Sequence, residues 1–237
     1  MREADVLIVG GGPAGSTCAW KLKQSGLETL ILDRAPFPRT KLCAGWITPQ
    51  VVDDLELDIA AYPHRFLTFD RLEFNWKGLR LRKKTTQHSI RRFEFDEFLL
   101  RRSGAELVTH KVRNIERRAD GFVIDGKFRG RFLVGAGGTS CPVYRQFFHD
   151  SNPRVKALQI ATYEQEFAYD WTNGECKLWF FGDGLPGYAW YVPKENGYVN
   201  VGLGGKAETM KSHSMRLQDY WEKFTLRLSE WGLVKDT

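Results

Sequence analysis

The chain has 237 residues, of which 42% are hydrophobic, and a formal net charge of +6 at pH 7. This length allows one large domain or two small ones, and no apolar run approaches the roughly 20 residues of a membrane-spanning helix. The four cysteines (Cys18, Cys43, Cys141 and Cys176) lack Cys-x-x-Cys spacing and the histidines lack ligand spacing. We therefore expect no metal site and a reducing, cytoplasmic location.

The basic residues gather in short segments, and this charge has two interpretations. The simpler one is a solvated basic face, and the functional one is attraction to phosphates or to an anionic membrane surface. No nucleic-acid-binding motif accompanies the charge, so we expect no nucleic acid partner. The segments are 77–84, 91–92, 101–102, 113–118 and 127–131.

The first thirty residues follow a strand–turn–helix–strand pattern. Apolar runs at 6–9 and 30–32 predict two buried strands, and a helix is expected over 14–24. Because the first strand begins almost at the start of the sequence, we expect no secretory signal. Three glycines with Gly-x-Gly-x-x-Gly spacing stand between the first strand and the helix, which in this context is the dinucleotide-binding fingerprint.

Each glycine of the fingerprint has its own role. Gly10 permits the tight turn, Gly12 lets the backbone approach a pyrophosphate, and Gly15 lets the helix lie close to the strand. The helix N-terminus, at Pro13 and Ala14, offers free N–H groups and a partial positive charge to the phosphates.

Asp33 ends the second predicted strand, eighteen residues after Gly15. A carboxylate at this position is placed to accept hydrogen bonds from an adenosine ribose. It also disfavours a 2′-phosphate, so FAD or NAD is preferred over NADP.

The rest of the chain reads as an alternation of strands and helices, after an irregular segment at 34–46 that contains two prolines and a glycine. Helices are expected at 49–57, 92–104, 142–148 and 208–231. Strands are expected at 66–76, 79–83, 87–91, 106–109, 132–136, 155–167, 175–181, 188–192 and 198–203, with a small meander at 112–118, 121–125 and 127–128.

Two kinds of sheet are therefore interleaved. The runs at 5–9, 29–32, 106–109 and 132–136 are typical of buried parallel strands, whereas 66–91 and 155–203 favour an antiparallel, half-exposed sheet. We predict an α/β fold, α+β overall: a Rossmann-like nucleotide-binding domain with a small β-meander and an inserted antiparallel-sheet substrate domain.

Four stretches resemble the para-hydroxybenzoate hydroxylase-type flavoproteins and, among them, most resemble the geranylgeranyl reductase family. The second and fourth stretches discriminate best, because the first is shared by the whole superfamily. They are Gly10-Gly-Gly-Pro-Ala-Gly15 with Asp33-Arg34; Phe37-Pro-Arg-Thr-Lys-Leu-Cys-Ala-Gly45; Arg92-x-x-Phe95-Asp96-x-x-Leu99; and Gly187-Tyr-Ala-Trp-Tyr-Val-Pro-Lys194 followed by Val199-Asn-Val-Gly202-Leu-Gly204.

The resemblance implies FAD as cofactor, with NAD(P)H as one candidate electron donor, and a discontinuous FAD-binding domain. That domain would comprise 1–65 and 92–150, the substrate domain 66–91 and 151–207, and a helix at 208–237 would lead back toward the FAD domain. The implied cofactor contacts are Gly10, Gly12, Pro13, Ala14, Gly15, Asp33, Arg34, Lys41, Cys43, Ala44, Arg92, Val112 and Gly138.

Several of these residues have competing interpretations. Cys43 is a candidate proton donor beside the flavin, or a small buried thiol. Arg92 is the candidate phosphate or ribose ligand, with Arg91 as the competing choice. Tyr188 and Trp190 form either an aromatic wall for an apolar substrate or ordinary core packing.

Two departures from the superfamily pattern matter. The Gly-Ala-Asp-Gly motif is Gly135-Ala-Gly137-Gly138 here, which argues against an NADPH-driven hydroxylase. The late Gly-Asp-Ala segment has no counterpart, because Gly182-Asp183 reads as a turn between strands. We therefore expect that segment to lie beyond Thr237, and FAD to be held weakly.

The leading hypothesis is a reductase that uses reduced FAD on carbon–carbon double bonds of an apolar, isoprenoid or lipid-like substrate, with peripheral membrane contact. One alternative is a flavin-dependent monooxygenase or halogenase acting on an aromatic compound. Another is a truncated flavoprotein fragment without activity.

Overall fold

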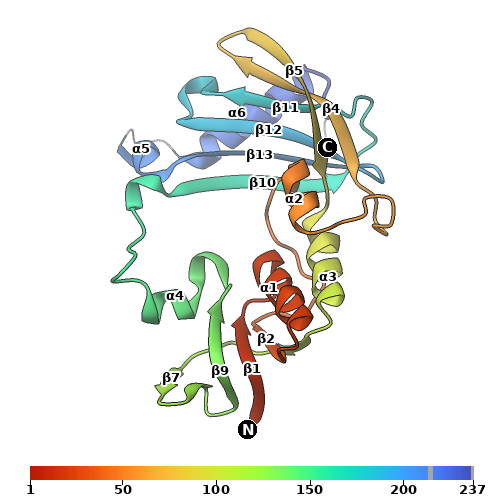
Figure 1. The fold of residues 1–237 in the computed structure, drawn as a ribbon. Helices are drawn as coiled ribbons and strands as arrows, with labels where there is room; N and C mark the ends of the chain where they lie inside the picture. The colour runs from red at the N-terminus through yellow and green to blue at the C-terminus, as the bar shows by residue number, and fades with distance from the viewer. Residues whose placement is uncertain (213–215, 236–237) are drawn as a thin grey trace. The chain divides into compact units, whose positions relative to one another are not determined.

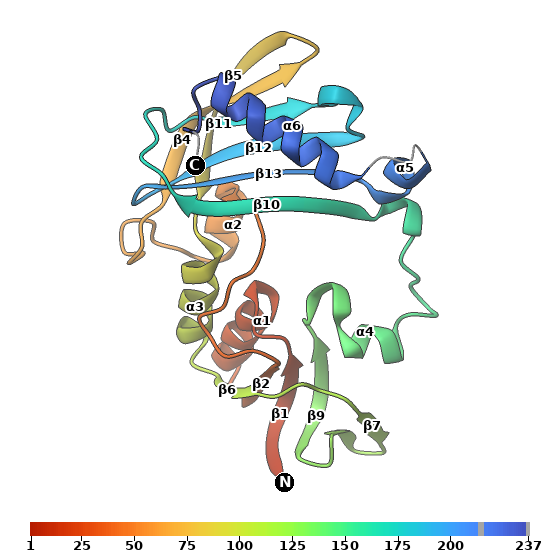
Figure 2. The ribbon, with the colours of Figure 1, turned by 180° about the vertical axis from the view of Figure 1, so that it is seen from behind.

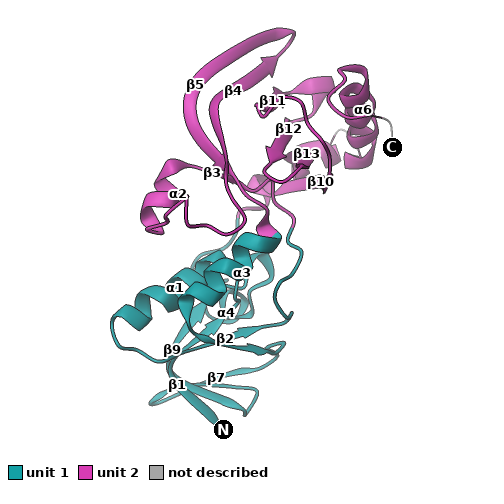
Figure 3. Ribbon diagram, turned by 90° about the vertical axis from the view of Figure 1, so that its right-hand side faces the viewer, with its two compact units in different colours: residues 1–41, 93–154 teal, residues 42–92, 155–237 magenta. Residues whose placement is uncertain are grey.

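The computed structural model describes residues 1–212 and 216–235, and the chain divides into two compact units (Figure 3). Unit 1 comprises residues 1–41 and 93–154, and unit 2 comprises residues 42–92 and 155–237. Residues 42–65, expected in the nucleotide-binding domain, fall in unit 2. The reason is that β3 (Trp46–Ile47) pairs with a strand of the unit 2 sheet.

A six-stranded sheet of order β6-β2-β1-β9-β8-β7 organises unit 1. The four predicted apolar runs form its parallel part, as expected for strands covered on both faces. The strands are β1 (Arg2–Val9), β2 (Thr29–Asp33), β6 (Glu106–Thr109), β7 (Ile115–Arg118), β8 (Gly121–Ile124) and β9 (Phe128–Gly135).

The sequence analysis was wrong to separate the last meander strand from the apolar run at 132–136. Both belong to β9, which pairs with β8 through its first residues and with β1 along its length. Gly130 lies inside β9 and does not end the strand. Its lack of a side chain is needed there, because a Cβ would come within 2.7 Å of the Leu7 side chain. This glycine marks close packing in the sheet and does not form a turn.

Helices cover both faces of the unit 1 sheet. Val6 and Ile8 pack with side chains of α1 (Pro13–Gln24) and α3 (Arg92–Ser103), whereas Leu7 and Val9 pack with those of α4 (Pro142–Phe147). A short 3₁₀ turn, η1 (Gly138–Ser140), precedes α4. This alternation along β1 is what the period of a strand dictates.

Unit 2 is built on a seven-stranded sheet of order β10-β13-β12-β11-β4-β5-β3. It is antiparallel except that β11 pairs with β4 in parallel, which corrects the prediction of a purely antiparallel sheet. One strand also replaces the two expected at 79–83 and 87–91, because β5 pairs with β4 on both sides of the two threonines between them, across a register shift between Phe69 and Arg71. The strands beyond β3 are β4 (Leu67–Trp76), β5 (Leu79–Ser89), β10 (Ile160–Ala168), β11 (Cys176–Phe180), β12 (Gly187–Lys194) and β13 (Tyr198–Lys206).

Helix α6 (Leu217–Glu230) crosses one face of this sheet (Figure 2) and packs through Tyr220, Trp221, Phe224 and Leu228. The single helix expected over 208–231 is wrong, because Arg216 is extended (φ −95°, ψ 138°) and α5 (Ala207–Ser212) is separate. Part of that prediction, 213–215, lies outside the described residues. The remaining elements are α2 (Pro49–Asp54), η2 (Lys156–Leu158) and η3 (Gly182–Gly184).

The predicted turn at Asp183-Gly184 is confirmed, since η3 connects β11 to β12. Over the described ranges, none of the helices has both the length and the apolar character needed to span a bilayer. Within the same ranges, no group of three or more His, Cys, Asp or Glu side chains is arranged to hold a metal ion.

Candidate functional site

The fingerprint of unit 1 forms a tight turn between β1 and α1 (Figure 1). Gly10 has φ +109°, and a Cβ there would lie 2.5 Å from the Ala136 carbonyl oxygen. A Cβ at Gly15 would lie 1.9 Å from the Gly10 carbonyl oxygen. Both positions therefore require glycine. Gly12 is different, because a Cβ there would meet only Arg39 Nη2, at 3.3 Å.

The N-terminus of α1 has the character of an anion site. Gly12 is its N-cap residue and supplies no side-chain cap, Pro13 occupies the first turn, and that turn contains no acidic residue. Ala14 is exposed at the same end. The N–H groups of this turn are therefore directed at a position where a phosphate would be stabilised by hydrogen bonds and by the helix dipole.

Asp33 ends β2 and is buried at the fingerprint. Its Oδ2 accepts a hydrogen bond from the Gly11 N–H at 2.8 Å, and its Oδ1 accepts one from the Ala35 N–H at 3.1 Å. Each carboxylate oxygen has a second lone pair. The backbone thus fixes the carboxylate while leaving acceptor capacity for ribose hydroxyls.

Arg39 is a residue of this site that the sequence analysis quoted in a motif but did not assign. Its guanidinium lies 3.7 Å from both Asp33 and Asp96 and covers the Phe37 ring at 4.6 Å. Its Nε is buried and has no hydrogen-bond partner within the described residues. An unpartnered guanidinium N–H beside Gly12 fits the diphosphate of FAD, so the residues present fit this cofactor.

The other predicted cofactor residues of unit 1 are more scattered. Arg34 and Lys41 are exposed. Val112 packs against the hydrophobic cluster on the α4 side of the sheet, so a contact to a cofactor would come from its backbone. Gly138 opens η1 with φ +68°, and its carbonyl accepts a hydrogen bond from Arg154 Nη2 at 3.3 Å.

Arg91 and Arg92, the competing candidates, differ in their surroundings. Arg91 Nε donates to Glu166 Oε1 at 2.9 Å, and its guanidinium stacks over the Tyr198 ring at 3.6 Å, so it is engaged inside unit 2. Arg92 is half-buried at the first position of α3. Arg92 therefore stays the predicted cofactor ligand.

In unit 2, Tyr188 and Trp190 lie on one face of β12, the face opposite α6. Phe180 stacks on Tyr188 at 5.5 Å and Phe74 stacks on Phe180 at 6.1 Å. We call these four side chains the aromatic wall. Trp190 is buried and Tyr188 is 42% exposed, so Tyr188 presents the open surface while Trp190 supports it.

The segment 42–45, which we call the Cys43 loop, lies on the same face of the sheet as Trp190. Ala44 packs against the cluster that contains Trp190. Asn200 connects the two, because its Oδ1 accepts from Trp190 Nε1 at 2.8 Å and its Nδ2 donates to the Cys43 carbonyl at 3.4 Å. The structure thus brings together Cys43 and Trp190, which the sequence analysis had predicted separately.

A buried lysine also holds this loop. Lys194 of β12 is completely buried and donates from Nζ to the Ala44 carbonyl. Burial lowers the pKa of Lys194 to about 8, against the opposing effect of Glu166 and other nearby groups. Burial also raises the pKa of Glu164 on β10, which is separated from β12 by β13 in the sheet. The sequence analysis quoted Lys194 in a motif but did not predict this cluster, because Ala44 and Lys194 are far apart along the chain.

Comparison with known proteins agrees with this geometry. Residues 5–97 match the protein family described as FAD dependent oxidoreductase. The chain is 33% identical to an uncharacterized protein of Methanosarcina barkeri, over 95% of this chain and 60% of the relative. It is 29% identical to menaquinone reductase of Mycolicibacterium smegmatis, over 98% and 62% of the two chains. It is 26% identical to digeranylgeranylglycerophospholipid reductase 1 of Methanothermobacter thermautotrophicus, over 94% and 61%.

The fold is shared with a solved structure, a geranylgeranyl bacteriochlorophyll reductase-like protein from Thermoplasma acidophilum. The TM-score is 0.75 at 19% identity, covering 94% of this chain and 62% of the other. The present chain therefore spans about 60% of the length of the curated relatives it matches.

These findings define the class that residues 5–97 match, the FAD-dependent oxidoreductases, and FAD is the cofactor of that class. Within the class, the chain is similar to relatives named digeranylgeranylglycerophospholipid reductase and geranylgeranyl diphosphate reductase, in agreement with the resemblance of its motifs.

Proposed function

We propose that this protein reduces carbon–carbon double bonds of an apolar, isoprenoid-type substrate. The observation that carries the proposal is the aromatic wall on the same sheet face as the Cys43 loop, in a chain whose fingerprint fits FAD. Relatives named as reductases of menaquinone and of digeranylgeranylglycerophospholipid support it. The monooxygenase or halogenase alternative has support from fold likeness, since a flavin-dependent halogenase of similar structure is 20% identical.

The residues have distinct proposed roles. The α1 N-terminus and Arg39 would bind the FAD diphosphate, while Asp33 would bind the ribose. Bound reduced FAD supplies a hydride. Tyr188 would orient the apolar chain by its exposed ring face, and Cys43 would hold a proton at Sγ for the second carbon.

The test is anaerobic turnover. Protein reconstituted with FAD would be reduced with dithionite and, separately, with NADPH or NADH, then mixed with a geranylgeranyl lipid. We expect reoxidation of the flavin spectrum together with products that gain two hydrogens per double bond. Cys43→Ala should slow turnover without weakening FAD binding. Flavin reoxidation that needs oxygen and an aromatic compound, with no hydrogenated product, would contradict the proposal.

We also propose that the protein contacts a membrane surface, where lipid-like substrates reside. The basic segments and the apolar substrate class support this part of the proposal.

A further inference from the structure

The β4–β5 hairpin has exposed apolar residues that the proposed chemistry does not use. It lies toward one edge of the unit 2 sheet, where β4 is the neighbour of β11 (Figures 1 and 3). Near its turn, Trp76 is 50% exposed, Leu79 is 67% exposed and Leu81 is 66% exposed. Large apolar side chains gathered on the surface are typical of an interaction site.

These three side chains lie on one face of the hairpin. In the antiparallel register of β4 and β5, Trp76 stands opposite Leu79, and Phe74 stands opposite Leu81. Directly opposed residues of an antiparallel pair project to the same side of the sheet. The exposed surface is therefore a single apolar face, which we call the hairpin face: Trp76, Leu79 and Leu81.

The register carries the hairpin face across the sheet to the aromatic wall. Trp76 is the partner of Phe180, and Phe180 is the partner of Tyr188. In the same register, Phe74 is the partner of Leu178, and Leu178 is the partner of Trp190. Two rows of apolar side chains thus span four adjacent strands: Leu79, Trp76, Phe180 and Tyr188, and beside them Leu81, Phe74, Leu178 and Trp190.

The hairpin is also strongly basic. Segment 76–84 contains five basic and no acidic residues. Arg80 and Arg82 lie 3.6 Å and 3.2 Å from the buried carboxylate of Glu73, so part of their charge is compensated. Three exposed lysines (Lys77, Lys83 and Lys84) stand around the apolar residues. An exposed tryptophan and leucines bordered by lysines match the apolar interior and anionic headgroups of a membrane interface.

We propose that the hairpin face docks on an anionic lipid bilayer and that the two apolar rows lead a lipid substrate from the bilayer to the aromatic wall. Docking needs only the exposed residues and the basic charge. The path to the wall rests on the proposed function.

Vesicle co-sedimentation tests the docking. The protein would be mixed with phosphatidylcholine vesicles that contain or lack phosphatidylglycerol, at low and high salt. We expect binding to the anionic vesicles that weakens as salt rises. The double variant L79S/L81S should bind on the order of tenfold more weakly, because two apolar side chains no longer enter the interface. Leu226→Ser is the matched control, since Leu226 is 66% exposed on α6.

Tryptophan fluorescence provides a local reading. Vesicle binding should shift the emission to shorter wavelength, and Trp76→Phe should lose most of that shift. Binding that is absent, or equal in L79S/L81S and in the wild type, would overturn the docking proposal. Self-association that L79S/L81S abolishes would also overturn it, because a second copy would then be the occupant.

The path to the aromatic wall has a separate test. L79S/L81S should lower turnover of a substrate embedded in vesicles more strongly than turnover of the same substrate dispersed in detergent. Equal loss in both assays would contradict the path. Vesicle binding by a wild-type protein that reduces no double bond would leave the docking standing and remove the proposed function.

Discussion

At the residue scale, Asp33 and Arg39 are the side chains of unit 1 that we expect to bind a dinucleotide. Two backbone N–H groups fix the Asp33 carboxylate, and Arg39 lies 3.7 Å from it with a buried, unpartnered Nε within the part of the chain that the structure describes. The first residue is prepared to accept hydrogen bonds from a ribose, and the second to donate one to a phosphate.

Replacing Asp33 with Ala should weaken FAD binding by about 1.5–3 kcal/mol, because a charge-assisted hydrogen bond to the ribose is lost. Isothermal titration with FAD measures this. Asp120→Ala, at an exposed carboxylate of the meander, is the control and should leave binding unchanged. An affinity of Asp33→Ala within twofold of the wild type would refute the ribose assignment.

Replacing Arg39 with Met should lower FAD affinity on the order of tenfold, because a charge-assisted contact to the diphosphate disappears. The salt dependence of binding should also become shallower, since one cation fewer faces the phosphates. Arg131→Met changes an exposed arginine of β9 and should have neither effect. The assignment fails if Arg39→Met keeps the wild-type affinity and salt slope.

At the element scale, the strand–turn–helix unit has one glycine that the packing of the fold requires and another that leaves room for a ligand. Gly15 is needed because a Cβ would collide with the Gly10 carbonyl, whereas Gly12 borders open space apart from Arg39. The two glycines are three residues apart and look alike in the sequence, but their surroundings assign them different physical roles.

We expect Gly15→Ala to destabilise unit 1 by about 3 kcal/mol or more, since the backbone must move to admit the methyl group. Gly12→Ala should cost about 1 kcal/mol, because alanine is a poorer N-cap residue than glycine, yet it should still abolish tight FAD binding. Thermal unfolding and FAD titration of both variants check this. Equal destabilisation by the two substitutions would contradict the prediction, because the backbone would then accommodate a methyl group at Gly15 without a large loss of stability.

The elements also show where sequence reasoning ends. Continuous apolar runs identified the parallel strands, since strands buried on both faces need them. Which strands pair is a tertiary property, so the parallel pair β11–β4 was not predicted. The roles of Arg39 and Asn200 were missed because they also depend on tertiary contacts. Arg39 lies beside Asp96 of α3, and the contact from Asn200 to Cys43 joins residues 157 positions apart.

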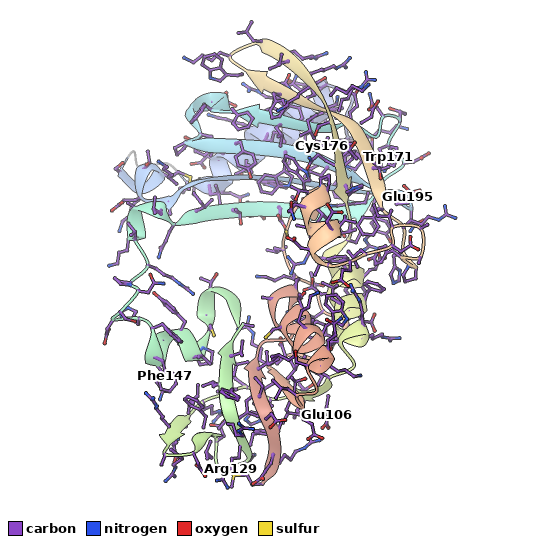
Figure 4. All side chains as sticks on the ribbon, in the orientation of Figure 1. Glu106, Arg129, Phe147, Trp171, Cys176 and Glu195 are labelled. Atoms are coloured by element: carbon purple, nitrogen blue, oxygen red, sulfur yellow. The ribbon has the colours of Figure 1, made fainter. Side chains whose placement is uncertain are left out.

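At the scale of the whole molecule, two buried groups of unit 2 respond to pH in opposite directions. Burial lowers the pKa of Lys194 to about 8, and burial raises the pKa of Cys176 (Figure 4) to about 12. In the unfolded chain the corresponding values are about 10.4 and 8.5. Between pH 8.5 and about 10.4, the folded lysine has released a proton that the unfolded chain keeps, while the folded cysteine keeps one that the unfolded chain has released.

The stability of unit 2 should therefore change little over this window, because the lysine raises it and the cysteine lowers it, each by about 1.4 kcal/mol per pH unit. Lys194→Met should give a stability that falls with pH, and Cys176→Ala one that rises. Urea unfolding followed by tryptophan fluorescence measures this, since Trp20 is the only one of the eight tryptophans outside unit 2. The slopes, and not the absolute stabilities, carry the test. If both variants keep the wild-type slope, the two groups titrate alike in the folded and unfolded chains, and Lys194 is not the buried cation that holds the Cys43 loop.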